Sequence, residues 1–262
     1  MATVNNFLID HVLRGIMLSN KDGSYMWSVN QITDPSLNVT SETSEVTDAI
    51  GTVITTFNRG KSAEFSASNS LFDLGLFAAQ NGVDKEEASS THKISTPTFE
   101  TLEYTGVDTV TLAHVPTEDI DKIYLLNGDG TLGTIYTSGA EAGADKFVYD
   151  SAAHSIKFPT GLTTGTQLMA IYDYELEEGV AVTGDAINFP KAGRFIMEVL
   201  GTDTCDTTTQ IHAYVEFPNA KLSSEFDLNF TSDGAHPFTI NAAQSYCDPK
   251  KTLYRIIIPN EE

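Results

Sequence analysis

The stretch from Ser41 to Gly82 constrains the fold most, because it contains the clearest helix signal in a chain that otherwise has strand-like patterns. It predicts a strand, a turn at Gly51, a second strand and then one helix. The helix is expected over 70–80, since Ser70 and Asp73 have the spacing of a capping box and Asn81-Gly82 is a left-handed stop signal. A lone helix in a largely β chain usually covers an open end or edge of a sheet.

The composition indicates a globular protein with a real core. The 262 residues suffice for one large or two small domains. With 40% hydrophobic and 10% aromatic residues, the chain differs from a disordered one. No apolar run approaches the roughly 18 residues of a membrane helix, and the start of the chain lacks the sections of a secretion signal. We therefore expect a mature protein with no membrane partner.

The charge is strongly one-sided, because 36 acidic residues face 15 lysines and arginines, a net charge of −21. Such a surface repels nucleic acid. Two interpretations stay open: the acids provide solubility alone, or they keep the protein from binding a polyanion that passes nearby.

The two cysteines, Cys205 and Cys247, are too few for a disulfide scaffold and belong to no CxxC or Cys/His cluster. Two free thiols in a reducing cytosol are favoured, and a bridge between them stays an alternative.

The sequence pattern changes in the middle of the chain, where short strand candidates alternate with turn signals. This pattern predicts a small Ig-like β-sandwich inserted at 104–179, with 1–103 and 180–262 forming one discontinuous β domain. Inside the insertion, strands are expected at 110–112, 122–126, 132–136, 146–149, 155–158 and 167–176. After it, strands are expected at 186–189, 195–200, 209–217, 224–230, 238–240 and 252–258.

Motifs for catalysis, cofactors or metals are not found in the sequence. Asn127-Gly128-Asp129-Gly130 resembles part of a calcium loop but lacks the sixth-position glycine and the closing acid, so a hairpin turn is favoured. The group Asp203, Cys205 and Asp206 could hold an ion, but an ordinary loop is favoured. The six histidines have no zinc-site spacing, and no GxSxG, GxxxxGK[ST] or GxGxxG occurs. We expect no enzyme, no cofactor and no metal.

Four features together resemble the major tail tube proteins of tailed bacteriophages. They are the acidic, Ser/Thr-rich strand segment 37–45 followed by a long hairpin over 46–65, the capped helix, the closing strand series 220–259, and the acidic charge. The resemblance covers roughly residues 1–100 and 180–262. It implies a mainly β fold: a β-sandwich or half-barrel with one helix, plus the small inserted Ig-like β-sandwich.

The resemblance also implies a function and partners. Members of that family form hexameric rings that stack into a tube, and the hairpin and N-terminal segment reach neighbouring rings. Inner sheets line the channel through which the genome leaves. The implied partners are further copies of the chain, other tail proteins, and DNA that passes without specific binding. The implied location is the virion tail, after assembly in the host cytoplasm.

Two sets of residues are candidates for these roles. A duplex carries about one negative charge per 1.7 Å of axis, so a wall rich in acids would let it slide. Each acid could instead simply face bulk water. The candidate inter-subunit residues of the hairpin are Val46, Ile50, Val53, Ile54, Phe57, Arg59 and Phe65. The candidate channel-lining acids are Glu42, Glu45, Asp48, Glu64, Glu225 and Asp227.

Two other classes of protein stay open as alternatives. The chain could be another virion part of similar texture, such as a capsid decoration or baseplate protein. It could also be a glycan-binding or hydrolytic β-sandwich, but this would need an aromatic platform, and the single tryptophan, Trp27, lies far along the chain from the insertion.

Overall fold

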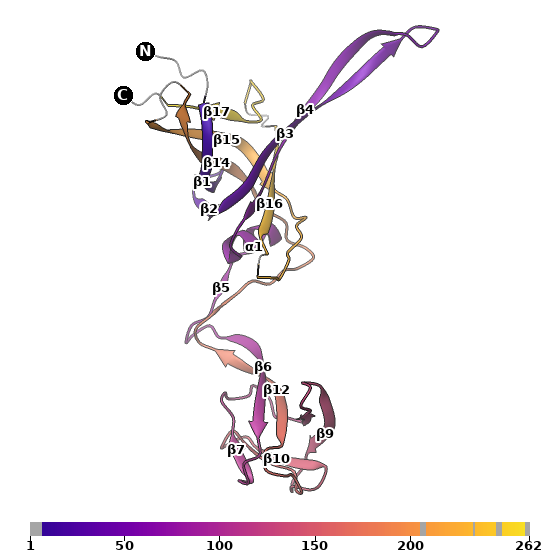
Figure 1. The fold of residues 1–262 in the computed structure, drawn as a ribbon, viewed down its shortest axis with the longest axis vertical. Helices are drawn as coiled ribbons and strands as arrows, with labels where there is room; N and C mark the ends of the chain where they lie inside the picture. Colours follow the sequence, from indigo (N-terminus) through magenta and orange to yellow (C-terminus); the bar gives the residue numbers. More distant parts are fainter. Residues whose placement is uncertain (1–6, 205–207, 233, 245–247, 260–262) are drawn as a thin grey trace. The chain divides into compact units, whose positions relative to one another are not determined.

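The computed structural model describes residues 7–204, 208–232, 234–244 and 248–259. These residues form seventeen strands and one α-helix, so the predicted mainly β fold with a single helix is confirmed (Figure 1). The chain divides into two compact units. We call Met1–Lys85 with Val182–Glu262 the first unit, and Glu86–Ala181 the second unit.

The first unit is built on one large antiparallel sheet that curves into a half-barrel. Its strands are β1 (Phe7–Ser19), β2 (Tyr25–Val29), β3 (Ile32–Thr47), β4 (Val53–Asn69), β14 (Ala192–Asp203), β15 (Gln210–Leu222), β16 (His236–Ala242) and β17 (Arg255–Ile257). Their order across the sheet is β2-β1-β14-β15-β16-β4-β3, and β17 pairs with β15 beside the point where β16 joins it. Strands far apart in sequence are therefore neighbours, as β1 and β14 are (Figure 1).

Aromatic side chains fill the core of the first unit. Trp27, Phe65, Phe195, Phe217 and Phe238 come from five different strands and are all buried. Their ring centroids lie 5.7 to 6.3 Å apart, the spacing of tilted and edge-to-face aromatic pairs. They come from strands whose side chains alternate between a core face and an outer face, which is the period-2 pattern the sequence predicted for 209–217.

The helix α1 (Leu74–Asn81) begins later than predicted. Its N-cap is Asp73 and not Ser70: Asp73 has extended backbone angles, and its carboxylate accepts the N–H of Leu76 at 2.8 Å. Ser70 instead continues the chain out of β4 and donates its N–H to the carbonyl of Gln31. The predicted left-handed stop is confirmed, since Gly82 has φ = 72° and donates to the last turn.

The predicted hairpin over 46–65 has wrong bounds. β3 and β4 form one ladder from Ile32↔Asn69 to Thr47↔Val53, so the segment 37–45 is the first strand of this same hairpin. The predicted turn is confirmed: Gly51 has φ = 86°, and Asp48 Oδ1 accepts the N–H of Ile50 and of Thr52. The alternating pattern of a polar strand predicts which side chains share a face, but it does not predict which strand pairs with it. The predicted hairpin therefore began at residue 46 and left out its own first strand.

Two predicted strands are absent and one is shorter. Residues 186–189 and 224–230 lie outside any strand. The Asp185 carboxylate accepts the N–H groups of Ile187 and Asn188, which bends the first segment. The strand expected at 252–258 is reduced to β17. Cys205, Cys247 and Asp206 lie outside the described residues, so the thiol prediction stays a prediction.

The second unit is a separate β structure with its own core. Its main strands are β6 (Ile94–Glu103), β7 (Thr109–Thr111), β8 (Lys122–Leu126), β9 (Leu132–Ser138), β10 (Lys146–Asp150), β11 (Ser155–Lys157) and β12 (Gln167–Leu176). The six strands predicted here are therefore confirmed within two residues. Ile123, Phe147, Ile156 and Leu168 are fully buried at its centre. The short pair β5 (Glu86–Glu87) and β13 (Val180–Ala181) adds a small second sheet.

Two features of the second unit differ from the sequence-based description. β6 pairs with β12 along its whole length, although the sequence grouped 94–103 with the flanking domain. The strand order is β6-β12-β8-β9-β10-β11-β7, with β9 and β10 parallel. An immunoglobulin constant domain has the orders A-B-E-D and C-F-G in two sheets. The Ig-like character of the insertion stays a prediction.

Candidate assembly surfaces

The distal part of the β3–β4 hairpin leaves the core of the first unit (Figure 1). Phe65 and Ala63 are the last buried side chains of β4 before the turn. Beyond the pair Val39↔Ala63, both strands run to Thr47↔Val53 with their side chains exposed or nearly so. At about 3.3 Å per residue, this two-stranded ribbon projects roughly 25–30 Å. We call this ribbon, residues 39–63, the arm.

Most of the candidate inter-subunit residues gather toward the tip of the arm. Ile50 is 88% exposed and Phe57 is 53% exposed. Arg59 is exposed beside Glu42, its partner in the ladder. Phe65 differs from the rest: it is 1% exposed and belongs to the core of its own subunit, because it lies where the ladder still packs on Phe217. The other exposed apolar side chains of the set are Val46, Val53 and Ile54.

The arm also lies at the edge of the sheet. β3 is last in the strand order, and in the described part of the chain no strand pairs with its outer side. The ladder contains bulges at Asp34-Pro35 and at Gly60, where the φ angles of Asp34 and Gly60 are positive. Bulges and a proline bend such an edge and weaken its ability to pair with unrelated strands.

The candidate channel-lining acids fall in two separate places. Four are exposed side chains on or beside the arm: Glu42, Glu45, Asp48 and Glu64. Glu225 and Asp227 are exposed in the segment between β15 and β16, whose described residues form no strand. The structure therefore does not bring the six acids together on one sheet face within a subunit.

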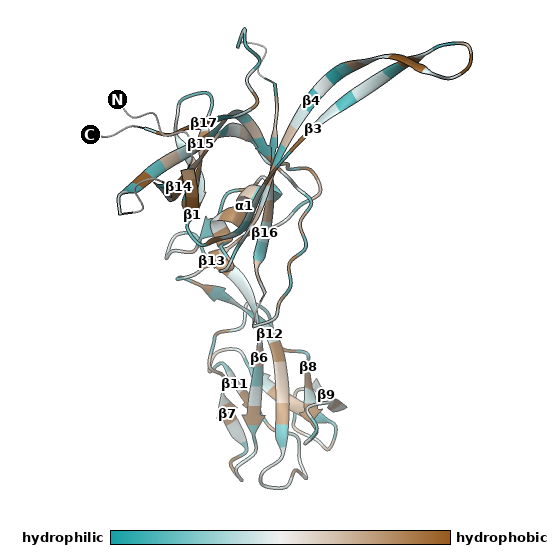
Figure 2. Ribbon diagram, turned by 45° about the horizontal axis from the view of Figure 1, so that its top comes forward, coloured by the Kyte–Doolittle hydropathy of each residue, from teal (hydrophilic) through white to brown (hydrophobic). Residues whose placement is uncertain are grey.

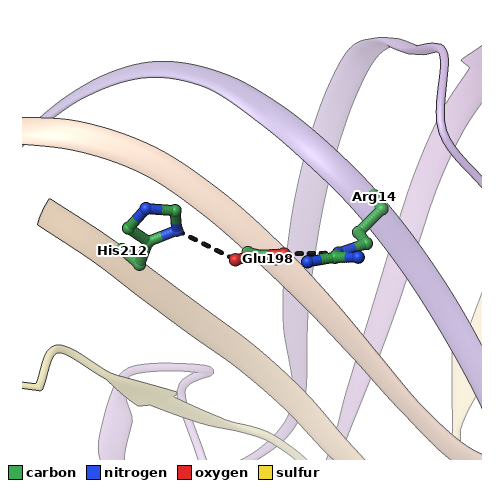
Figure 3. Close-up of polar contacts among 3 residues, drawn as sticks. All are labelled: Arg14, Glu198 and His212. Atoms are coloured by element: carbon green, nitrogen blue, oxygen red, sulfur yellow. Dashed lines mark hydrogen bonds and ion pairs between the residues drawn. The ribbon is translucent and has the colours of Figure 1, made fainter. Parts of the chain in front are cut away.

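A different charged surface lies on the outer face of β1, β14 and β15. Phe195, Met197 and Val199 of β14 point into the core, so Arg194 and Glu198 point to the opposite side. In β15 the core residues alternate with His212 and Glu216 in the same way. This face carries two groups of ion pairs, of which Figure 3 shows the first.

Glu198 occupies the centre of the first group of ion pairs. Arg14 Nε donates to Oε2 of Glu198 at 2.5 Å, and His212 Nδ1 lies 2.9 Å from Oε1 (Figure 3). The Glu198 side chain is only 10% exposed, whereas that of Arg14 is 59% exposed. The hydrogen bond from Arg14, with that from His212, lowers the pKa of Glu198 below its usual value despite burial. The same pair raises the pKa of Arg14.

Glu216 forms the second group with two arginines. Arg194 Nε donates to one carboxylate oxygen at 2.5 Å, and Arg255 Nε donates to the other. The Glu216 side chain is 5% exposed. Burial alone would raise the pKa of Glu216, but the hydrogen bonds and charges of Arg255 and Arg194 outweigh it, so the pKa is lowered.

Three of the four arginines in the chain therefore lie on one sheet face. With two glutamates among them, the group carries a net charge of 3 − 2 = +1 when His212 is neutral, in a chain of net charge −21. We call this surface, residues Arg14, Arg194 and Arg255 with Glu198 and Glu216, the arginine face.

Sequence reasoning missed the arginine face. A signal was present: Arg194 and Glu198, and likewise His212 and Glu216, are four residues apart in strands that are otherwise apolar. That spacing puts both members on the same face of a strand. The third partner, Arg14, is 184 residues from Glu198, and no local pattern shows that they meet.

A small apolar pocket lies beside the start of α1. It has a volume of about 220 Å³ and includes Phe72, Leu228 and Phe230 in its wall. His236 also lines this pocket and is buried: its Nε2 lies 2.7 Å from Gln80 Oε1, and the N–H of Asp73 approaches its Nδ1 at 3.4 Å. Burial lowers the pKa of His236. Among the described residues that line it, the pocket holds no pair of acid and base suited to catalysis.

Two other kinds of site are absent from the described part of the chain. No group of three or more histidine, cysteine or acidic side chains is arranged to hold a metal ion. No helix there has the length and apolar character needed to span a membrane.

Comparison with known proteins places the chain in a family. A search of curated proteins finds no match. A comparison with protein families matches residues 7–255, nearly the whole chain, to the YomU/Tube protein family. The family description points to a tube-type structural protein, in agreement with the tail-tube resemblance of the sequence. The chain, with its half-barrel sheet and projecting arm, belongs to the YomU/Tube protein family.

Proposed function

We propose that this protein is a structural component of the virion tail of a phage, which assembles with copies of itself into stacked rings that form the tail tube. The rings are hexamers, as in the tail tube proteins that the sequence resembles, and other tail proteins bind at the ends of the tube. The protein has no catalytic role in this assembly.

The observation that carries this proposal is the arm. A two-stranded ribbon is marginally stable alone in water. Here both faces of the arm are exposed, and within the described residues neither of its edges is paired, because β16 pairs with β4 only as far as Glu64. Apolar side chains at its tip, among them Ile50 and Phe57, are exposed and do not pack on the core of their own subunit. Such a ribbon gains its stability from a surface on another molecule, and a second copy of the chain is always available during assembly.

The charge supports a channel for genome delivery. DNA and a surface of net charge −21 per subunit repel each other, so a duplex would move through the tube without specific binding. In the proposed tube, the exposed acids on the arm, together with Glu225 and Asp227, contribute to the negative potential of the bore. They do so from two different regions of each subunit.

Electron microscopy of the purified full-length protein tests the proposal directly. We expect rings and tubes in negative stain. A variant in which residues 43–58 are replaced by a short turn is expected to fold, with an unchanged urea-unfolding transition of the core, and to stay a single subunit. Assembly of this shortened variant would contradict the role of the arm.

The same images separate the alternatives. A capsid decoration protein would give monomers or trimers that bind capsids and never polymerise. A baseplate protein would give a closed complex of fixed size. A glycan-binding sandwich would give a signal on a glycan array and no tubes.

A further inference from the structure

We propose that the arginine face is the surface that receives the arm of a second copy. This inference rests on the proposed self-assembly and names the two surfaces that meet in it: the arm of one subunit, and Arg14, Arg194 and Arg255 of the next.

The arginines are held in place before any partner arrives. Glu198 and Glu216 are nearly buried, and each is bonded by two basic side chains, so the guanidinium groups start from fixed positions. The arginine side chains are nevertheless 45–59% exposed. The observed bonds use Nε, and a guanidinium has further N–H donors at its two terminal nitrogens. A preordered donor array loses less conformational entropy on binding.

The side chains around the arginines suit a protein partner. Ile16, Ile196 and Tyr214 lie on the same face of the strands as Arg14 and Arg194 and are partly exposed. Ile257 of β17 is exposed beside Tyr214, its ladder partner. Arginine and tyrosine are enriched at the centres of protein interfaces, where the buried surface is also more apolar than at the rim. Hydrophobic groups between the charges distinguish this face from a purely electrostatic phosphate-binding surface.

The arm has the complementary chemistry. The outer part of the arm, residues 43–58, carries Glu45 and Asp48 and no lysine or arginine, so this part has a charge of −2. The rest of the arm adds Glu42, Arg59 and Lys61, so the whole arm has a charge of −3 + 2 = −1. Its exposed apolar side chains could contact the isoleucines between the arginines. Carboxylates and guanidinium groups form strong, often bidentate, hydrogen bonds when they meet.

The arm of a subunit cannot contact the arginine face of the same subunit. The arm projects away from β1, β14 and β15 of the same unit (Figure 2). In the proposed assembly the contact is heterologous: each copy offers one arm and one receiving face, and the chain of contacts continues until a ring or a tube closes it. An arginine face that is covered by an arm is also removed from DNA in the bore, which keeps the bore acidic.

The other two occupants that the structure suggests become outcomes of the test. The arm could enter the apolar pocket beside Phe72 of the next copy, or the arginine face could bind nucleic-acid phosphate. The first would make assembly independent of the arginines. The second would make duplex binding depend on them.

Two variants test the contact, each with a matched control. The face variant is R194Q/E216Q/R255Q, which keeps polar groups but lowers the net charge by one unit; its control is K21Q, with the same charge change in an exposed turn. The arm variant is E45K/D48N, in which asparagine keeps the oxygen that accepts the turn N–H groups. Its control is E141K/D145N, with the same charge change at exposed acids of the second unit. Urea unfolding checks that all four fold.

Assembly is measured by sedimentation at increasing protein concentration. We expect the face variant and the arm variant each to need at least about tenfold more protein than the wild type to assemble, the effect of losing close interfacial charge pairs. The two controls should assemble like the wild type. An equal mixture of the two variants should form a finite complex containing both in equal amounts, because one partner keeps its arm and the other keeps its face.

Three results would overturn the inference. In the first, the folded face variant assembles at the same protein concentration as the wild type. In the second, the face variant and the arm variant form no complex when they are mixed. In the third, an anisotropy titration shows that a labelled DNA duplex binds the wild type but not the face variant. Failure of the proposed function looks different: the wild type itself then forms no rings or tubes, or the arm-deleted protein still does.

Discussion

The β3–β4 ladder beyond Ala63 and the β14–β15 ladder have the same antiparallel pairing but opposite surroundings. In β14–β15, one face is packed on the aromatic core and the other carries charged side chains that are bonded to each other. In the arm, neither face is packed on the subunit, although apolar side chains occur along it. Backbone pairing alone therefore does not distinguish a structural strand from an assembly element.

The difference shows which contacts stabilise the subunit and which are kept for a partner. Core side chains contribute to the free energy of unfolding of the single chain, whereas arm side chains contribute only when a second copy covers them. The same residue type should thus have a large effect on stability in one ladder and on assembly in the other. Two pairs of substitutions test this contrast directly, and two pH experiments then test its packed side, from the largest expected effect to the smallest.

The strongest contrast is between two phenylalanines. Phe217→Ala removes a fully buried ring from among Phe65, Phe195 and Tyr254 and should lower the free energy of unfolding by about 3–5 kcal/mol. Phe57→Ala on the arm should change it by less than about 0.5 kcal/mol but weaken assembly. Urea unfolding and sedimentation measure the two effects. Equal destabilisation by both substitutions would remove the distinction between the ladders.

Two glycines sharpen the comparison at the level of the backbone. At Gly82, which has φ = +72°, an added Cβ would lie 2.3 Å from the backbone of Phe189, so Gly82→Ala should cost at least about 2 kcal/mol. At Gly51 in the tip of the arm, φ is +86° but the space is open, so Gly51→Ala should cost about 1 kcal/mol. Thermal unfolding monitored by circular dichroism compares them, and a reversed order would contradict the packing described at the end of α1.

The buried glutamates of the arginine face predict a loss of stability in acid. The folded state lowers the pKa of Glu198 and Glu216, so the unfolded state takes up protons first as the pH falls. Their contribution is complete above the ordinary glutamate pKa of 4.5 and is lost as the pH falls through their lower folded values. Unfolding of wild type and of Glu198→Gln/Glu216→Gln from pH 7 to pH 3 should show a flatter acid limb in the variant. If stability fell equally in both proteins as the pH was lowered, Glu198 and Glu216 would not be the cause of the loss of stability in acid.

His236 predicts a smaller effect at higher pH. Burial lowers its pKa in the folded protein below the ordinary value of 6.5, so the native state holds the neutral ring between Gln80 and Asp73. Its contribution is present above pH 6.5 and is lost as the pH falls below that value, because the unfolded state binds the proton more readily. An NMR titration of the His236 ring should give a midpoint below 6.5. A midpoint above the ordinary value would contradict a desolvated, neutral ring.

The sequence predicted local structure well where one residue or a short pattern decides it. The turn at Gly51 and the stop at Gly82 follow from backbone angles that glycine adopts without strain. The six strands expected within the insertion occur because each is a short apolar run between turn residues. The strands expected at 186–189 and 224–230 failed for the converse reason: Asp185 and Ser223 bond nearby backbone groups and turn the chain, which an apolar pattern does not reveal.

By itself, the sequence determined the β-rich composition, the lone helix, the acidic charge and the faces along each strand, since all of these depend on residues close together in the chain. Only the tertiary structure decided that Arg14 meets Glu198, that Phe65 is buried while Phe57 is exposed in the same strand, and that 37–45 pairs with 56–65. The physical reason is that the two-residue period of a strand predicts which side chains share a face. Which strand pairs with it, and which surface packs on that face, depends on contacts between residues far apart in the chain.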